Sequence, residues 1–240
     1  MKGVVLAGGT GSRLMPLTKV TNKHLLPVGR CPMIHHPVKK LAEAGIEEIL
    51  IVTGVEHMGD VVNLLGSGIE FGVRFTYKVQ DQAGGIAQAL SLAENFSGGG
   101  RLAVILGDNI FQDSLRGETG RYREQSSGAR VLLKKVPDPQ RFGVAEIADG
   151  KVIGIEEKPS QPKSDYAVTG VYFYDETVFE MIRTMKPSAR GELEITDVNN
   201  AYLARGELTY GMLDGWWSDA GTFESLARVQ RLIAGAGDHE

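Results

Sequence analysis

The chain has 240 residues and a net charge of −4, with 42% hydrophobic and 23% charged residues. This composition is ordinary for a soluble globular protein, and the length suits one large α/β domain or two small ones. The negative charge argues against a nucleic-acid surface, because such surfaces carry a basic face. No apolar stretch of the sequence is long enough to span a membrane.

The single cysteine, Cys31, excludes an intrachain disulfide and fits a reducing compartment. Residues 1–3 lead directly into a strand-like run, so we expect no signal peptide. Both observations predict a cytoplasmic protein.

Apolar strand-like runs alternate with helix-like runs in the first half of the chain. The expected elements are, in order, a strand at Gly3–Ala7, a helix at Ile34–Ala44, a strand at Glu48–Thr53, a helix at His57–Leu65, a strand at Val73–Tyr77, a helix at Ile86–Ala93 and a strand at Leu102–Leu106. Continuous apolar strands between helices are typical of a doubly wound, mostly parallel sheet. We therefore predict a three-layer, Rossmann-like α/β fold.

The second half of the chain has a different pattern. Four strand-like runs follow one another closely, at Val131–Val136, Val144–Ile147, Val152–Glu156 and Ala167–Tyr174. Their spacing predicts antiparallel strands laid on or beside the first sheet. Helical patterns return at Val178–Met185, Ile195–Ala204 and Phe223–Ile233. We expect a single domain over residues 1–240 with two lobes, at about 1–112 and 113–221, and a final helix at about 222–235.

A glycine-rich loop, Gly8-Gly9-Thr10-Gly11-Ser12-Arg13, follows the first strand. Glycines let backbone N–H groups turn toward an anion, and Arg13 adds a permanent positive charge. Leu14 stands where a G-x-G-x-x-G motif needs its third glycine, and the Gly-Lys-Ser/Thr ending of a P-loop is missing. The loop therefore predicts a phosphate site. The departures from both motifs indicate that its ligand is neither a dinucleotide cofactor nor a P-loop nucleotide.

Asp108 comes directly after the apolar strand Leu102–Leu106 and Gly107. Loops at the carboxyl ends of parallel strands meet at one crevice, so Asp108 should face the glycine loop. A carboxylate beside phosphates needs a bridging cation, which Mg²⁺ supplies; the alternative is a helix cap. Asp219, before the last helix, offers a second carboxylate for the same ion or a simple helix-entry residue.

Other polar residues have two interpretations each. Lys23 and Lys158 are candidate phosphate contacts, although most lysines are solvated surface residues. Arg190 lies in a glycine-flanked turn and otherwise fits a helix entry with an acidic first turn. Gln80 and Gly85 could contact the edge of a pyrimidine base or form a polar turn. The sequence contains no H-E-x-x-H or G-x-S-x-G motif and no evident nucleophile.

Taken together, the motifs resemble those of the sugar-1-phosphate nucleotidylyltransferases over essentially the whole chain, most closely of those that join dTTP to glucose 1-phosphate. The segments that carry the resemblance are 6–14, 22–27, 85–89, 106–111, 141–144, 156–159, 166–170 and 188–197. The resemblance implies that dTTP and α-D-glucose 1-phosphate give dTDP-glucose and pyrophosphate with Mg²⁺. It also implies a nucleotide-binding first lobe, a sugar-binding second lobe and a homo-oligomer, either dimer or tetramer. In this family dTDP-glucose commonly feeds deoxysugars such as rhamnose for polysaccharides.

On the nucleotide side, the resemblance implies roles at positions that match the family motifs. Gly8 and Gly11 match backbone contacts to the nucleotide. Arg13 and Lys23 match a clamp on the triphosphate. The expected thymine contacts are Gln80 and Gly85, and the expected Mg²⁺ ligands are Asp108 and Asp219.

On the sugar side, the resemblance implies that Gly143, Glu157 and Val168 contact the hexose. Lys158 and Arg190 match residues that hold the sugar phosphate. The catalytic set that follows is Arg13, Lys23, Asp108, Lys158 and Asp219.

The sequence also departs from the family pattern. Residues 217–221 read Trp-Ser-Asp-Ala-Gly where longer relatives carry Trp-Leu-Asp-Thr-Gly, and 83–84 read Ala-Gly where relatives often carry Pro-Asp. Longer members continue into a segment with subunit contacts and a regulatory product site, so we expect a short form. Two alternatives remain: a transferase for UTP or another hexose 1-phosphate, and a non-catalytic sensor of nucleotide sugars.

Overall fold

A computed structural model describes residues 1–235, which build a nine-stranded mixed sheet with helices on both faces. The strands of this sheet are β1 (Lys2–Ala7), β4 (Glu48–Gly54), β5 (Arg74–Gln80), β6 (Leu102–Leu106), β8 (Ala129–Lys135), β9 (Gly143–Ala148), β10 (Lys151–Glu157), β11 (Tyr166–Tyr174) and β12 (Leu208–Met212). Two short pairs lie outside it, β2 (Pro27–Val28) with β3 (Cys31–Pro32) and β7 (Asn109–Phe111) with β13 (Trp217–Asp219).

The helices are α1 (His35–Glu43), α2 (Met58–Leu65), α3 (Ile86–Ser91), α4 (Glu94–Ser97), α5 (Arg116–Glu124), α6 (Val178–Thr184), α7 (Ile195–Ala204) and α8 (Phe223–Gly235). Most of the expected helices and strands occur within a few residues of their predicted bounds. Several boundaries differ by a few residues; for example, α2 begins at Met58 because His57 belongs to a 3-10 turn, and β5 runs on to Gln80.

The parallel part of the sheet has the order β6-β1-β4-β5. Val5 of β1 lies between Ile51 of β4 and Ile105 of β6, and all three side chains are fully buried. The chain moves outward from β1 to β4 and β5 and then returns to β6 on the other side of β1. Such a reversal opens a crevice at the carboxyl ends of the two central strands. The predicted doubly wound, mostly parallel sheet is confirmed.

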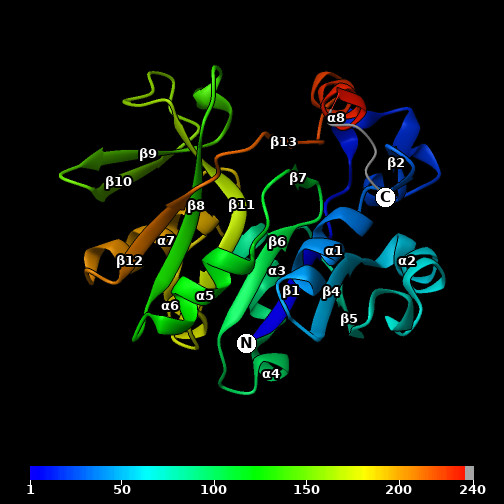
Figure 1. Ribbon diagram of the computed structural model, residues 1–240, viewed down its shortest axis with the longest axis horizontal. Helices are drawn as coiled ribbons and strands as arrows, with labels where there is room; N and C mark the ends of the chain where they lie inside the picture. Colours follow the sequence, from blue (N-terminus) through cyan, green and yellow to red (C-terminus); the bar gives the residue numbers. More distant parts are fainter. Residues whose placement is uncertain (236–240) are drawn as a thin grey trace.

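Helices cover both faces of the sheet and make three layers (Figure 1). One core includes Leu41 of α1 and Tyr122 of α5. The core on the opposite face includes Leu90 of α3, Ile182 of α6 and Tyr202 of α7. Both faces of the central strands are therefore apolar, which explains the continuous hydrophobic runs in the sequence.

The second half of the chain extends the same sheet. Val171 of β11 lies antiparallel to Ile105 of β6, and β8 and β9 both pair with β11. The predicted antiparallel strands thus lie beside the parallel ones and do not form a layer on top of them. β12, which was not predicted, adds to the sheet parallel to β8.

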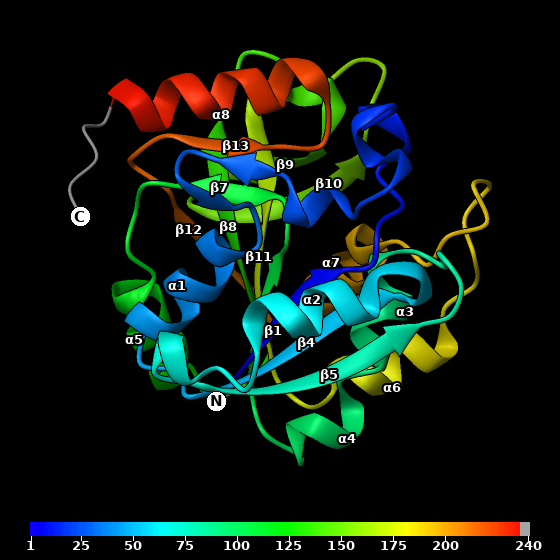
Figure 2. The ribbon, with the colours of Figure 1, turned by 90° about the vertical axis from the view of Figure 1, so that its right-hand side faces the viewer.

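The long helix α8 crosses the top of the molecule above β13 and the β2–β3 pair (Figure 2). It closes a third, smaller core that includes Leu14, Leu26, Ile110, Ala220 and Val229. Leu14 directly follows Arg13, Ala220 directly follows Asp219, and Ile110 lies two residues after Asp108. This small core therefore fixes the relative positions of polar groups around the crevice.

Candidate active site

Two adjoining clefts, of about 360 and 320 Å³, open along the crevice between the two halves. Arg13 and Asp108 line both of them. Lining residues of the first cleft that the sequence predicted are Gly143, Glu157, Lys158, Val168 and Asp219. Those of the second are Gly8, Lys23, Gln80 and Gly85. The structure therefore brings most of the expected residues into one continuous site.

Two expected residues, Gly11 and Arg190, line neither of these clefts. Gly11 adopts a φ of 68° at the start of a 3-10 turn, and a Cβ there would lie 2.9 Å from Thr18 and 3.1 Å from the Cβ of Lys23. Arg190 directs its guanidinium to Glu194, with both Nη2–O distances at 2.8 Å, and lies 3.5 Å from Glu157. Gly11 thus shapes the glycine loop, and Arg190 contacts two carboxylates, Glu157 and Glu194, that line the first cleft.

Gln80 is the last residue of β5 and is buried against the glycine loop. Its Nε2 donates to the carbonyl of Gly85 at 3.3 Å and to Oε1 of Gln88 at 2.5 Å. Its Oε1 lies against Gly8, where a Cβ would come within 2.2 Å of it. The side-chain amide is therefore held in one orientation at the end of the sheet.

Gly85 joins the two halves of the site through backbone contacts. Its φ is 98°, and a Cβ at this position would lie 2.5 Å from the carbonyl oxygen of Leu193. The neighbouring Gly84 carbonyl accepts from the N–H of Leu193 at 2.8 Å. Only glycine combines this backbone angle with such close approach.

Asp108 is a buried carboxylate with two polar partners. Lys23 donates to Oδ2 at 2.5 Å, and the side-chain amide of Asn109 donates to Oδ1 at 3.0 Å. Burial alone would raise the pKa of Asp108, but the ammonium of Lys23 and these hydrogen bonds outweigh it and lower the pKa. Asp108 is therefore ionised at neutral pH.

His24 lies beside this pair in the cleft wall. Complete burial, with a smaller contribution from Lys23, lowers the pKa of His24 to about 3. Its Nδ1 lies 2.7 Å from Oδ1 of Asn22. The imidazole is therefore neutral at neutral pH and adds no charge to the site.

The β7–β13 pair brings Asp219 next to Asp108. β7 begins directly after Asp108, and Asp219 pairs with Asn109 across the two strands. The N–H of Ala220 also donates to the Asp108 carbonyl at 2.8 Å. The position that a Cβ at Gly221 would take lies 3.2 Å from Oδ2 of Asp219 and 3.3 Å from Oδ2 of Asp108. Both carboxylates therefore face the same space.

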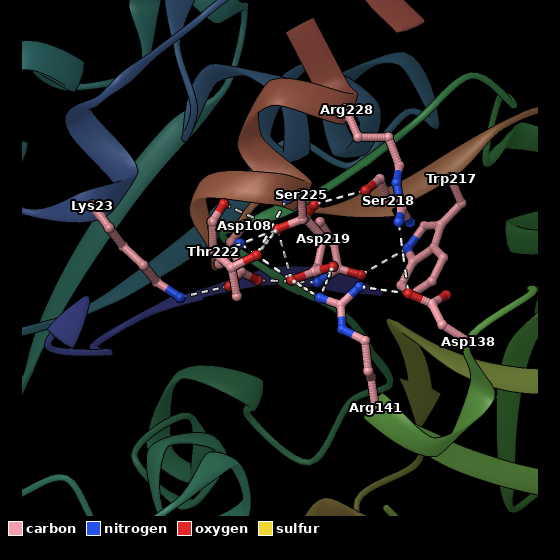
Figure 3. Close-up of polar contacts among 12 residues, drawn as sticks. Lys23, Asp108, Asp138, Arg141, Trp217, Ser218, Asp219, Thr222, Ser225 and Arg228 are labelled. Carbon is pink, nitrogen blue, oxygen red and sulfur yellow. Dashed lines mark hydrogen bonds and ion pairs between the residues drawn. The ribbon is translucent and has the colours of Figure 1, made fainter. Parts of the chain in front are cut away.

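Cations approach the two carboxylates from opposite sides, Lys23 at Asp108 and Arg141 at Asp219 (Figure 3). Within residues 1–235, no cluster of three acidic, histidine or cysteine side chains could hold a metal ion. Two carboxylates that leave room for phosphates and water fit the hard oxygen ligands of Mg²⁺. The donor set thus fits a magnesium ion whose coordination the substrates complete.

Glu157 is a half-buried carboxylate in the first cleft. Its carboxylate accepts a hydrogen bond from the Thr196 hydroxyl at 2.6 Å and forms an ion pair with the Lys158 ammonium at 3.0 Å. A Cβ at Gly143 would lie 3.4 Å from its Oε2, so this carboxylate packs against the start of β9. This part of the cleft therefore holds a carboxylate that is already paired with a cation and a hydroxyl group.

Comparisons with known proteins agree with this geometry. The family model described as nucleotidyl transferase matches residues 2–235. The chain belongs to the nucleotidyl transferase family.

The similar proteins found by sequence and by structure include several that share one enzyme name. A glucose-1-phosphate thymidylyltransferase of Neisseria gonorrhoeae is 47% identical over 97% of this chain and 82% of the relative. One from Mycolicibacterium smegmatis is 45% identical over the same shares. A Bacillus anthracis protein described as a glucose-1-phosphate thymidylyltransferase, solved in complex with a sucrose, is 63% identical with a TM-score of 0.95, over 100% of this chain and 96% of that one.

A UDP-glucose pyrophosphorylase solved with UDP-glucose is more distant, at 26% identity and a TM-score of 0.87 over 98% of both chains.

In the nucleotidyl transferase described here, no helix within residues 1–235 is long and apolar enough to cross a membrane.

Three residues in the site of this nucleotidyl transferase were not singled out by the sequence. Asn109 accepts from the backbone of Gly170 and from the Trp217 indole, and so fixes the amide that orients Asp108. Arg141 and Thr196 bond to expected site residues. Each lies inside a segment that carries the family resemblance, but only their contacts distinguish them from their neighbours.

Proposed function

We propose that this chain transfers a thymidylyl group from dTTP to α-D-glucose 1-phosphate, with dTDP-glucose and pyrophosphate as products. The observation that carries the proposal is the meeting of Asp108 and Asp219 with Arg13 at the junction of two clefts. Relatives at 45–47% identity over 97% of the chain, named for this reaction, support the choice of substrates.

The nucleotide occupies the cleft beside the glycine loop. Gly8 and Gly11 shape the backbone that faces the phosphates, and Arg13 and Lys23 neutralise the triphosphate. The fixed amide of Gln80 contacts the thymine edge, and Gly85 lets the backbone approach the base. These assignments follow from the cleft lining and from the charges available.

The sugar phosphate occupies the adjoining cleft. Glu157 accepts hydrogen bonds from hexose hydroxyl groups, while Gly143 and Val168 form the wall against the ring. Lys158 and Arg190 neutralise the phosphate once it competes with their present carboxylate partners. Residues 1–112 thus serve as the nucleotide half and 113–221 as the sugar half.

The reaction needs no nucleophile from the protein. A phosphate oxygen of glucose 1-phosphate attacks the α-phosphorus of dTTP in line, and pyrophosphate leaves. Both reactants are anions, so the contribution of the chain is to align them and to place cations at the attacking and leaving oxygens. Asp108 and Asp219 would hold Mg²⁺, which when bound stabilises the charge on the transferred phosphoryl group.

The direct test is pyrophosphate release from dTTP and glucose 1-phosphate, with Mg²⁺ and with a chelator. We expect release that depends on all three components, and dTDP-glucose as the nucleotide product. Binding of dTDP-glucose without any release would instead support a non-catalytic sensor. The same assay also measures the metal requirement.

A second candidate is the same reaction with UTP, favoured by the likeness to a UDP-glucose pyrophosphorylase. Thymine and uracil share their hydrogen-bonding edge, so Gln80 alone separates them poorly. A pocket for the thymine methyl contributes only about 1–3 kcal/mol. A panel of nucleotides and hexose 1-phosphates in the release assay, ranked by kcat/KM, decides between the two.

We place the reaction in the cytoplasm and the enzyme in a homo-oligomer.

A further inference from the structure

Arg141 occupies both oxygens of the Asp219 carboxylate. Its Nη2 lies 3.1 Å from Oδ1 and 3.3 Å from Oδ2 of Asp219, and its Nη1 donates to Oδ2 of Asp138 at 2.9 Å (Figure 3). The Asp219 side chain is only 14% exposed, so water screens this contact little. Charge-assisted bonds of this kind are among the stronger side-chain hydrogen bonds.

The position of Arg141 is fixed from several sides. Its guanidinium lies 5.0 Å from the centre of the Phe142 ring, and that ring packs edge-on against Trp217 with centroids 5.0 Å apart. Arg228 of α8 lies 3.6 Å from the same Asp138 oxygen that Arg141 contacts. Arg141 is therefore a built-in partner of Asp219 and not a surface chain that meets it by chance.

The Asp219 carboxylate has little unused capacity to accept further hydrogen bonds or to bind a cation. Its Oδ2 also accepts from the N–H of Gly221 and from the hydroxyl of Ser225, each at 3.2 Å. Three donors, Arg141, Gly221 and Ser225, thus meet Oδ2, an oxygen with two lone pairs, whereas Arg141 alone meets Oδ1. Oδ2 is also the oxygen that faces the same space as Asp108, so a metal ion shared by the two carboxylates through Oδ2 must displace at least one of these donors.

Arg141 is the donor whose displacement is compatible with the site. The Gly221 and Ser225 contacts belong to the turn that begins α8. Arg141 instead lines the cleft together with Lys158, where an anionic substrate offers it a new partner.

We propose that Arg141 competes with the divalent ion for Asp219 and so acts as a positioning residue that gates metal binding. The inference rests on the proposed function, which assigns Asp219 as a metal ligand. Arg141 and the metal ion draw on the same crowded oxygen and repel each other, so each weakens the other's contact with Asp219 by the same factor. Asp108 differs, because each of its oxygens meets a single donor, Lys23 at Oδ2 and Asn109 at Oδ1.

The test uses Mn²⁺ as the probe, measured by electron paramagnetic resonance on the full chain without substrates. Arg141→Met removes the competing charge and keeps an aliphatic side chain over Phe142. We expect Mn²⁺ to bind this variant about tenfold more tightly, a coupling of ordinary size. Arg141→Lys keeps the charge but loses the two-oxygen contact, and its affinity should lie between those of the two others.

Arg228→Met is the matched control, because it removes the same charge from the other side of Asp138. We expect its Mn²⁺ affinity to equal that of the native chain. An equal gain in Arg228→Met and Arg141→Met, or no gain in Arg141→Met, would overturn the proposal. Circular dichroism establishes that each variant is folded, and Arg141→Lys carries the test if Arg141→Met is not.

Asp219→Asn separates this proposal from the assignment on which it rests. If Asp219→Asn binds Mn²⁺ as the native chain does, then Asp219 is not a ligand and both the metal site and the inference are wrong. If Asp219→Asn loses affinity while Arg141→Met shows no gain, only the inference is wrong.

Discussion

The proposed nucleotide half and the proposed sugar half of the crevice hold their polar groups in different ways. In the nucleotide half, backbone and strand ends fix them: Gln80 ends β5 and Asp108 follows β6. In the sugar half, side chains hold one another: Glu157 lies between Lys158 and Arg190. The first set of groups is thus placed by the ends of parallel strands, with one ion pair between Lys23 and Asp108, whereas the second set depends mainly on ion pairs among its own side chains.

Asp108→Asn should have the largest effect, because it changes the carboxylate at the junction of the two halves. The neutral amide cannot hold a hard cation, and the buried Lys23 loses its partner. We expect kcat to fall by about 10³-fold, measured as pyrophosphate release at saturating Mg²⁺. Asp214→Asn, at an exposed position, is the control and should keep native activity. Retained activity in Asp108→Asn would show that another group holds the metal.

Arg13→Ala tests whether the two clefts share one cation. Arg13 lines both clefts. Its Nη2 lies 3.2 Å from the position that a Cβ at Gly221 would take, which Asp108 and Asp219 also face. Loss of a fixed charge partner in the transition state should cost more than about 100-fold in kcat/KM. The exposed Arg123→Ala serves as the control. A near-normal rate would remove Arg13 from the phosphate clamp.

Glu157→Gln should affect the sugar half alone. The amide keeps an acceptor for the Thr196 hydroxyl but loses the charge that strengthens hydrogen bonds to the hexose. We expect the KM for glucose 1-phosphate to rise about tenfold, while the KM for dTTP stays native. Glu156→Gln changes the exposed neighbour and should change neither value. Equal changes in both KM values would contradict the division of the crevice.

Sequence patterns were sufficient for the parallel half, because each central strand is buried on both faces and therefore reads as an unbroken apolar run. Three elements of the other half escaped prediction, α5, β12 and the three-residue strand β13. α5, Arg116–Glu124, is largely charged and lacks an apolar stripe, and β12, Leu208–Met212, is short, partly exposed and contains Gly211. Their positions are set by contacts that only the folded chain makes.

The sequence predicted the site residues that belong to recognisable motifs. It did not single out residues whose role depends on contacts between distant parts of the chain. The sequence placed Asp108 at a strand end, but it could not show that the three-residue pairing of β7 with β13 brings Asp219 beside it. Arg141 was visible only as part of a family segment. Its ion pairs join residues 3 and 78 positions away, and no local pattern encodes the longer separation.

Gly85→Ala should loosen the backbone connection between the halves. The new Cβ would collide with the Leu193 carbonyl, and the φ of 98° is strained for alanine. We expect a loss of about 2 kcal/mol in the free energy of unfolding, measured by urea denaturation. Gly45→Ala has a comparable positive φ but open space around it, so it should cost about 1 kcal/mol. Equal losses would mean that the contact with Leu193 adds nothing.

Asp175→Asn should have the smallest effect, away from the crevice. Burial alone would raise the pKa of Asp175, but hydrogen bonds from Thr177, Gly128 and Tyr202 outweigh it and lower the pKa below 3.8. The carboxylate therefore stabilises the fold above that pH, and the contribution fades as the pH falls through the lowered value.

The difference in unfolding free energy between the native chain and Asp175→Asn should therefore be largest near neutral pH and shrink in acid. The exposed Glu176→Gln is the control and should show no such trend. A difference that stays constant with pH would contradict the assignment.

The central claim is that Asp108 and Asp219 hold one divalent ion where the two halves meet. Anomalous diffraction from crystals grown with Mn²⁺ and a non-hydrolysable analogue of dTTP tests it most directly. We predict one peak within coordination distance of both carboxylates and of a phosphate oxygen. A peak that contacts only one of the two carboxylates, or that lies outside the crevice, would contradict the account.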